Sequence, residues 1–151
     1  MKILLISDRK NWAYATIANT IIKHNIDTSV CFDHLHSKNN YDQIRKVKNL
    51  YDYYFVIGWQ NYDSLRFLDK KRTLTGIHSH QSFDNRKTTI ERDVLPDQKT
   101  IDYLSGFRAV NTVSKRLKSI FNQCGITTVY TPNGVDSSLF CPISENRFKD
   151  G

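Results

Sequence analysis

The stretch that most constrains the fold runs from Asn111 to Ile143. It predicts a strand that ends at Ser114, then an amphipathic helix, a second short apolar strand and a turn. Apolar residues recur in the helical part at the i, i+3, i+4 and i+7 spacing of one stripe, at Leu117, Ile120, Phe121 and Cys124. Ser114 is expected to cap the start of this helix and Gly125 to end it. The segment is therefore a strand–helix–strand unit.

The rest of the chain repeats this alternation. The strand that opens this unit is Arg108–Val113. The further strands that we expect are Lys2–Ser7, Thr28–Phe32, Tyr53–Ile57 and Thr73–Ile77. The further helices are Trp12–His24, Tyr41–Leu50, Ser64–Leu68 and Ile101–Leu104. The first strand is almost continuously apolar, which is typical of a strand buried on both faces of a parallel sheet. We predict an α/β fold, a Rossmann-like three-layer sandwich with a mainly parallel sheet.

Some segments and side chains carry weaker patterns. Residues 34–40 are polar and are expected to form a loop, and residues 81–98 have no dependable period. A long irregular segment of this kind is often functional. The helical side chains that we expect to point inward are Ala15, Ala18, Ile21, Ile22, Ile44, Val47, Leu50, Leu65 and Leu68.

The run Pro-Asn-Gly-Val-Asp at 132–136, followed by Phe140 and Pro142, resembles a known family. It looks like the end of the N-terminal half of GT-B glycosyltransferases of the large retaining group 4. In that family a strand ending in Ser opens a basic helix, and an Asn-Gly-Val-Asp turn leads into the second domain. The resemblance covers residues 111–142. It implies that residues 1–143 form the acceptor-side domain, and that residues 144–151 begin the linker to a C-terminal donor-binding domain.

The resemblance also implies an activity. The whole enzyme would move a hexosyl group from a nucleoside-diphosphate sugar to a hydroxyl of a glycan or lipid acceptor, with retention and without a metal or other cofactor. In the family the donor-binding residues lie in the C-terminal domain, so the isolated chain of 151 residues is expected to be inactive. Basic residues of the last predicted helix, Lys115, Arg116 and Lys118, could add peripheral contact with anionic lipids, or simply form a solvated face.

Ligands of open parallel α/β sheets gather at the carboxyl ends of the strands. The candidate substrate-binding residues at those ends are Arg9, Lys10, Asn11, Trp12, Trp59, Gln60, Ser79, His80, Ser114, Asn133 and Gly134. The resemblance implies that His78 points into the cleft between the domains and contacts the transferred sugar as an orienting catalytic group, not as a nucleophile. A histidine that caps a turn or bonds a backbone carbonyl is the structural alternative.

Several of these residues have a second interpretation. The loop from Ser7 to Trp12 lacks the glycines that many group 4 enzymes have there, although Arg9 and Lys10 at a helix start could bind an anionic group. Trp12 could stack on a sugar or dock in the core, and Trp59 could line an acceptor pocket or fill the core. A His-x-His pair at 78 and 80 can ligate a metal, but no third ligand lies nearby in the sequence, so no metal site is expected.

Composition bears on partners and location. The chain has 22 Lys and Arg against 15 Asp and Glu, a net charge of +7, which favours anionic partners or serves solubility. Nucleic acid is not expected. The three cysteines are scattered, and the N-terminal apolar run is too short for a signal peptide, so we expect a cytoplasmic protein, with peripheral membrane contact as a further expectation. The alternative function is a non-catalytic Rossmann-like or flavodoxin-like module that binds an anionic partner.

Overall fold

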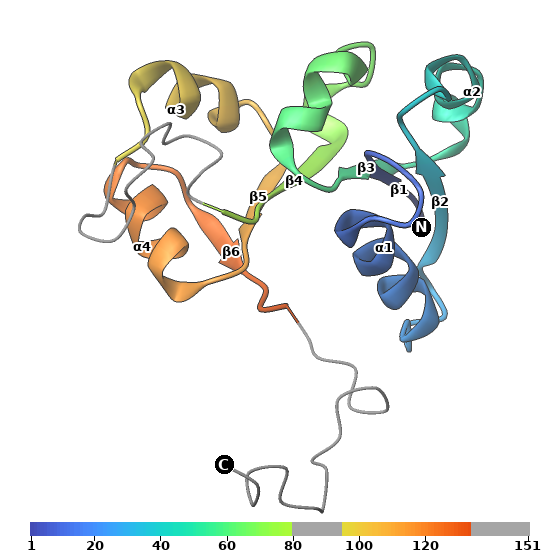
Figure 1. Ribbon diagram of the computed structural model, residues 1–151, viewed down its shortest axis with the longest axis horizontal. Helices are drawn as coiled ribbons and strands as arrows, with labels where there is room; N and C mark the ends of the chain where they lie inside the picture. Colours follow the sequence, from blue (N-terminus) through green and yellow to red (C-terminus); the bar gives the residue numbers. More distant parts are fainter. Residues whose placement is uncertain (80–94, 134–151) are drawn as a thin grey trace, which may run out of the picture.

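A six-stranded parallel sheet forms the centre of the computed structural model, which describes residues 1–79 and 95–133 (Figure 1). The strands are β1 (Lys2–Ser7), β2 (Cys31–His36), β3 (Tyr53–Val56), β4 (Thr73–Ile77), β5 (Ala109–Thr112) and β6 (Thr128–Tyr130). Their order in the sheet is β2-β1-β3-β4-β5-β6, and every neighbouring pair is parallel. The predicted Rossmann-like α/β fold with a parallel sheet is confirmed.

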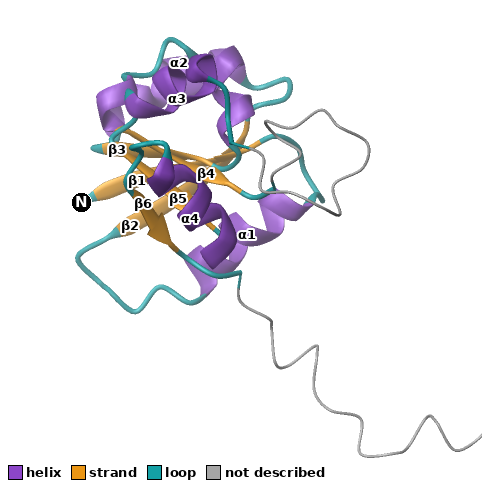
Figure 2. Ribbon diagram, turned by 90° about the vertical axis from the view of Figure 1, so that its left-hand side faces the viewer, coloured by secondary structure: helices purple, strands orange, loops and turns teal. Residues whose placement is uncertain are grey.

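Helices cover the two faces of the sheet unequally. The α-helices are α1 (Ala13–Lys23), α2 (Tyr41–Val47), α3 (Gln98–Ser105) and α4 (Lys115–Gln123), and the 3₁₀ segments are η1 (Lys48–Leu50), η2 (Trp59–Leu65) and η3 (Lys70–Arg72). Figure 2 shows α2 and α3 above the strands and α1 below them. Side chains of α2, η2, α3 and α4 share one core cluster, whereas α1 contributes to the other. We call these sides the helix-rich face and the α1 face.

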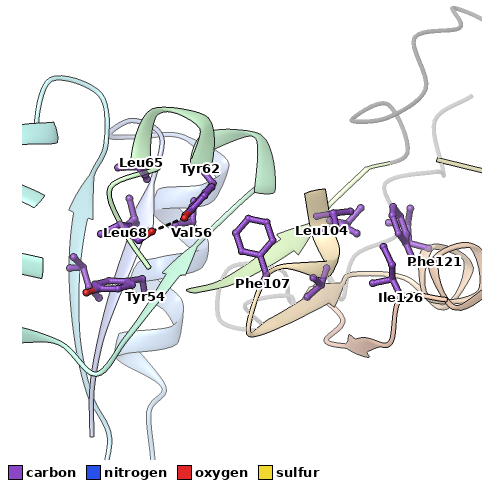
Figure 3. Close-up of a cluster of buried hydrophobic side chains, with 14 of the residues drawn as sticks. Tyr54, Val56, Tyr62, Leu65, Leu68, Leu104, Phe107, Phe121 and Ile126 are labelled. Carbon is purple, nitrogen blue, oxygen red and sulfur yellow. Dashed lines mark hydrogen bonds between the residues drawn. The ribbon is translucent and has the colours of Figure 1, made fainter. Parts of the chain in front are cut away.

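The main core lies on the helix-rich face. Tyr54 of β3 belongs to one cluster with Leu65, Leu104 and Phe121, and all of these side chains are at most 1% exposed (Figure 3). The hydroxyl of Tyr54 donates to the carbonyl oxygen of Lys48 at 2.8 Å. The polar atom of Tyr54 thus enters the core together with a backbone partner, as burial favours.

The α1 face has a smaller core. Only Leu5, Ala18 and Ile57 form its fully buried cluster, and α1 contacts mainly β1 and β2. The order of the strands reverses at β1, because β2 pairs with one edge of β1 and β3 pairs with its other edge. The α1 face lies next to this point. Such a switch point is where α/β sheets place their ligands.

The unit that begins at β5 agrees with its sequence pattern. The Oγ of Ser114 accepts a hydrogen bond from the backbone N–H of Leu117 at 3.1 Å, so the predicted cap of α4 is confirmed. Gly125 follows the helix with φ +79°, a left-handed conformation that favours glycine. The apolar stripe of α4 is buried, apart from the half-buried Cys124. The strands Lys2–Ser7 and Thr73–Ile77 have their predicted bounds.

The second strand lies further along the chain than predicted. We expected Thr28–Phe32, but β2 spans Cys31–His36, so the prediction of a loop over residues 34–36 was wrong. The carboxylate of Asp27 accepts hydrogen bonds from the N–H of Ser29 at 2.9 Å and from its hydroxyl at 2.6 Å. This local turn uses residues that we assigned to the strand. Pairing then starts at Cys31 opposite Lys2.

Other local predictions also need correction. The helix expected at Ser64–Leu68 is the 3₁₀ segment Trp59–Leu65, although Leu65 and Leu68 are buried as predicted. Ile22 and Leu50, expected to point inward, are 39% and 65% exposed, because α1 ends at Lys23 and α2 tightens into a 3₁₀ turn after Val47. The short helix at Ile101–Leu104 is found as the longer α3.

Three predicted features lie wholly or partly beyond the residues that the structure describes. Most of the irregular segment at 81–98, the turn after Asn133 and the linker at 144–151 lie outside the described residues. Within residues 1–79 and 95–133, no helix combines the length and the apolar character needed to span a bilayer.

Candidate functional site

A groove of about 490 Å³ lies on the α1 face, a size within the usual range of small-molecule pockets. Helix α1 forms one wall, and strands β3 to β6 form the floor. The apolar lining residues include Ile17, Ile21, Phe55, Leu74, Ala109 and Val129, and the polar ones include His78, Asn111, Thr131 and Asn133. The strand register places Phe55, Leu74 and Ala109 in one row across the sheet, before Gly76 and Asn111. The polar residues therefore gather toward the carboxyl ends of the strands.

His78 follows β4 directly and is half-buried at this polar end. The centre of its ring lies 4.9 Å from that of Tyr14, and the two rings are tilted by 50°. Its Nε2 atom is buried and has no hydrogen-bond partner among the described residues. Burial lowers the pKa of His78 below its usual value, so the ring is neutral at pH 7. A neutral imidazole can donate or accept one hydrogen bond at this atom.

Asn111 lies beside His78 on the neighbouring strand β5. Its side-chain Nδ2 donates to the Oγ1 of Thr131, while its Oδ1 is buried and lacks a partner in the part of the chain that the structure describes. Asn111 pairs with Gly76, the residue two positions before His78. A Cβ atom on Gly76 would lie 2.6 Å from the Asn111 Oδ1 and 2.7 Å from the His78 Nε2. Only glycine leaves the two polar atoms in these places.

A second glycine supports the Tyr14 ring. Gly58, at the end of β3, has φ +83°, and a Cβ atom there would lie 2.5 Å from the Cε2 of Tyr14. Burial, and to a smaller extent the charge of Asp8, raises the pKa of the Tyr14 phenol. The phenol therefore stays protonated at neutral pH. Gly58 thus allows α1 to bring an aromatic ring against the end of β3 and next to His78.

The predicted loop after β1 lies at the rim of the sheet. Arg9, Lys10, Asn11 and Trp12 are exposed there, and the guanidinium carbon of Arg9 lies 4.5 Å from the centroid of the Trp12 ring. Asn11 has φ +58°, which turns the chain into α1. Trp12 is 52% exposed, so it is not docked in the core. The loop presents a cation and an aromatic surface to solvent.

The structure separates the remaining predicted residues. Trp59 packs against Tyr103 on the helix-rich face, with ring centroids 5.6 Å apart, and Gln60 is exposed. Ser114 caps α4, whereas Asn133 lines the groove with His78. Ser79 is half-buried after β4. His80 and Gly134 lie outside the described residues.

Sequence reasoning missed Asn111, Gly76 and Tyr14, because we considered only the residues that follow each strand. Two signals were nevertheless present in the sequence. A glycine inside a predicted strand often marks a close approach of other groups, and an asparagine is unusual in the middle of a buried strand. Both signals fall on adjacent strands and mark the same place in the groove.

A second polar cluster lies at the edge of the α1 face. The Ser7 hydroxyl is within hydrogen-bond distance of His34 Nε2 at 2.9 Å and of His36 Nδ1 at 2.8 Å, and His34 Nδ1 lies 3.1 Å from the Asn19 Oδ1. Ser7 is fully buried, and its hydroxyl is already occupied by the two imidazole rings, so this cluster leaves no open contact for a substrate at Ser7. Among the described residues, no three His, Cys, Asp or Glu side chains are grouped as metal ligands.

No protein-family model matches this chain, and no match was found among curated proteins or solved structures. The function is therefore argued from the groove, the fold and the motif that begins at Pro132.

Proposed function

We propose that this chain is the acceptor-side domain of a retaining GT-B glycosyltransferase. The complete enzyme moves a hexosyl group from a nucleoside-diphosphate sugar to an acceptor hydroxyl. Three features support the proposal: a parallel Rossmann-like sheet, the Asn133-Gly134-Val135-Asp136 motif after β6, and a groove whose polar end lies toward the carboxyl ends of the strands.

The observation that carries the proposal is the Nε2 atom of His78, which is buried and unpaired among the described residues. Its Nε2 is buried at the polar end of the groove and has no partner within residues 1–79 and 95–133. A buried polar atom of this kind is destabilising unless something bonds it, and a sugar hydroxyl is a suitable partner. Because the ring is neutral and held beside Tyr14, it suits hydrogen bonding and orientation of the reacting groups.

The other residues of this chain have supporting roles in the proposal. Arg9 and Lys10 are exposed at the rim, where they can contact the diphosphate of a donor that the second domain holds. Lys115 and Arg116 are exposed on α4 and can approach anionic headgroups, which keeps peripheral membrane contact part of the proposal. The chemistry at the anomeric carbon belongs to the whole enzyme.

The test uses the longest natural protein that contains this chain. UDP-glucose and GDP-mannose are offered as donors, and hydrolysis and transfer are followed by release of the nucleoside diphosphate. We expect turnover of at least one donor, and a loss of about 100-fold in kcat for His78→Ala, the size seen when one stabilising hydrogen bond is removed.

The control is His24→Ala, because His24 is exposed at the end of α1 and is not one of the residues that line the groove. It should keep the wild-type rate. An unchanged rate and donor affinity in His78→Ala would remove His78 from the site. If no donor is turned over, the chain is better explained as a non-catalytic module that binds an anionic partner.

A further inference from the structure

Two buried polar atoms that have no partner among the described residues meet at the end of the groove, and His78 supplies only one of them. The other is the Oδ1 of Asn111. Each unsatisfied buried polar atom in a folded protein calls for an explanation, and two at one place call for a shared one. Both residues line the groove, so a ligand in the groove lies on the same side of the sheet as both of them.

The geometry allows one ligand atom to serve both. The Asn111 Oδ1 and the His78 Nε2 lie 2.6 and 2.7 Å from the position that a Cβ atom on Gly76 would occupy. By addition, the two atoms are at most 5.3 Å apart. Two hydrogen bonds of about 2.8 Å that meet at one oxygen span up to about 5.6 Å. A single oxygen can therefore bond His78 and Asn111 together.

The chemistry of the pair selects the kind of group. Asn111 uses its Nδ2 to donate to Thr131, which leaves its Oδ1 as a pure acceptor. Neutral His78 can donate from Nε2. With the ring proton on Nε2, the ligand group accepts a hydrogen bond from His78 and donates one to Asn111. A hydroxyl does both, whereas a carboxylate cannot donate and an ammonium cannot accept.

The rest of the groove indicates the chemical nature of the remainder of the ligand. Beyond Gly76 the floor is formed by Phe55, Leu74 and Ala109, and the α1 wall by Ile17 and Ile21. None of the lining residues in the described ranges is an Asp, Glu, Lys or Arg. An uncharged and largely apolar surface favours a neutral hydrocarbon and offers no cationic side chain to a phosphate.

We propose that this groove binds a neutral amphiphile, with His78 and Asn111 sharing one of its hydroxyls and its hydrocarbon part lying on the apolar floor. As the acceptor of the transferase, a role that rests on the proposed function, this ligand would be a lipid-linked hydroxyl compound and not a free oligosaccharide. His78 then stands at the junction between acceptor and transferred sugar, and Asn111 is a residue that determines acceptor specificity.

Binding is tested on the 151-residue chain without any donor. Octyl β-glucoside, glucose and octyltrimethylammonium are titrated below micellar concentrations, and the amide and imidazole signals of Asn111 and His78 are followed by NMR. Octyl β-glucoside should bind saturably and shift both signals. Glucose lacks the hydrocarbon and should bind at least about tenfold more weakly. The ammonium compound lacks the hydroxyl and should leave the Asn111 amide signal in place.

Two variants separate ligand contact from stability. Asn111→Ala should weaken octyl β-glucoside binding about tenfold, the effect of one hydrogen bond. Thr112→Val is the matched control, because Thr112 is the next residue of β5, is buried with an unpartnered hydroxyl, and faces the opposite side of the sheet. It should bind like the wild type. Thermal melts verify that both variants fold.

Equal binding by wild type and folded Asn111→Ala would overturn the proposal, and so would equal affinity for octyl β-glucoside and glucose. If Asn111→Ala does not fold, the wild-type titration decides, since an Asn111 amide signal that octyl β-glucoside leaves unmoved contradicts the contact. Because no donor is present, the outcome is independent of glycosyl transfer. Saturable binding in a protein that turns over no donor would leave the groove assigned and the transferase rejected.

Discussion

The two faces of the sheet are built from the same six strands but differ in how they are filled. On the helix-rich face, α2, η2, α3 and α4 enclose one continuous apolar core. On the α1 face a single helix covers β1 and β2, and a groove lies over β3 to β6. Alternating side chains of one strand serve both faces, since Ile77 enters the core while Gly76 and His78 face the groove. Stability and binding thus occupy opposite sides of the same strands.

Polar groups divide in the same way. In the helix-rich core they are mainly hydroxyls that donate to backbone carbonyls, as the Tyr62 hydroxyl does to the carbonyl oxygen of Leu68 at 2.6 Å. The hydroxyls of Thr112 and Thr128 are exceptions, because they have no partner among the described residues. On the α1 face they are histidines and amides, some bonded to one another and some without a partner. The two histidines whose pKa values are lowered, His34 and His78, therefore lie on the side with the smaller core.

The largest expected contrast is between two leucines. Leu104 is fully buried in the main core, so Leu104→Ala should lower the free energy of unfolding by about 3 kcal/mol through lost burial and a new cavity. Leu74 is half-buried on the groove floor, and Leu74→Ala should lower it by about 1 kcal/mol. Urea denaturation measures both. Equal losses would mean that the α1 face is as tightly packed as the other.

A somewhat smaller contrast is expected between two glycines. Gly58 has positive φ and the Tyr14 ring against it, whereas Gly125 has positive φ with nothing within 4 Å of a Cβ. Gly125→Ala, at the end of α4, should lose about 1 kcal/mol from backbone strain alone. Gly58→Ala should lose about 2 to 3 kcal/mol, since the ring must also move. Thermal unfolding compares the two variants.

The Gly58 variant also tests the support of His78. A shift of the His78 imidazole signal in Gly58→Ala, absent in Gly125→Ala, is expected because Tyr14 packs on His78. If the two glycine variants lose the same stability, the contact between Gly58 and Tyr14 is not needed for packing.

The sequence predicted those elements whose signal is local. Lys2–Ser7 is a continuous apolar run, and α4 carries its cap, its stripe and its terminating glycine within one segment. β2 lacks such a signal, because an edge strand with Asp33, His34 and His36 looks like a loop until its pairing with β1 is known. Whether these residues form a strand is decided by their long-range pairing with β1.

The site was predicted less well than the fold, for a related reason. His78 is found by the rule that ligands gather at strand ends, and so is Asn133. Asn111 lies inside its strand, and its meeting with His78 depends on the register that puts Gly76 opposite it. Trp59 follows a strand end, yet the turn of η2 directs it to Tyr103 on the other face. Neither register nor direction can be derived from strand ends alone.

The smallest expected effect concerns pH, and it belongs to the α1 face. Burial lowers the pKa of His34, with a further contribution from neighbouring His36, and burial lowers the pKa of His78. Their pKa values are then higher in the unfolded chain, near 6.5, so the unfolded state takes up protons first as the pH falls. Stability should be fully present above about pH 7 and decline as the pH drops through 6.5 toward the folded pKa values.

Urea unfolding at pH 7.5 and pH 5.5 measures this decline, which should be smaller in His34→Gln and in His78→Gln. Leu104→Ala should keep the wild-type decline at a lower overall stability, since it removes no titrating group. The lowered carboxyl pKa values of Asp27 and Asp97 contribute only below about pH 4, outside this window. If the decline is the same in both histidine variants as in the wild type, the pH sensitivity does not arise on the α1 face, and the division of polar groups between the faces has no effect on stability.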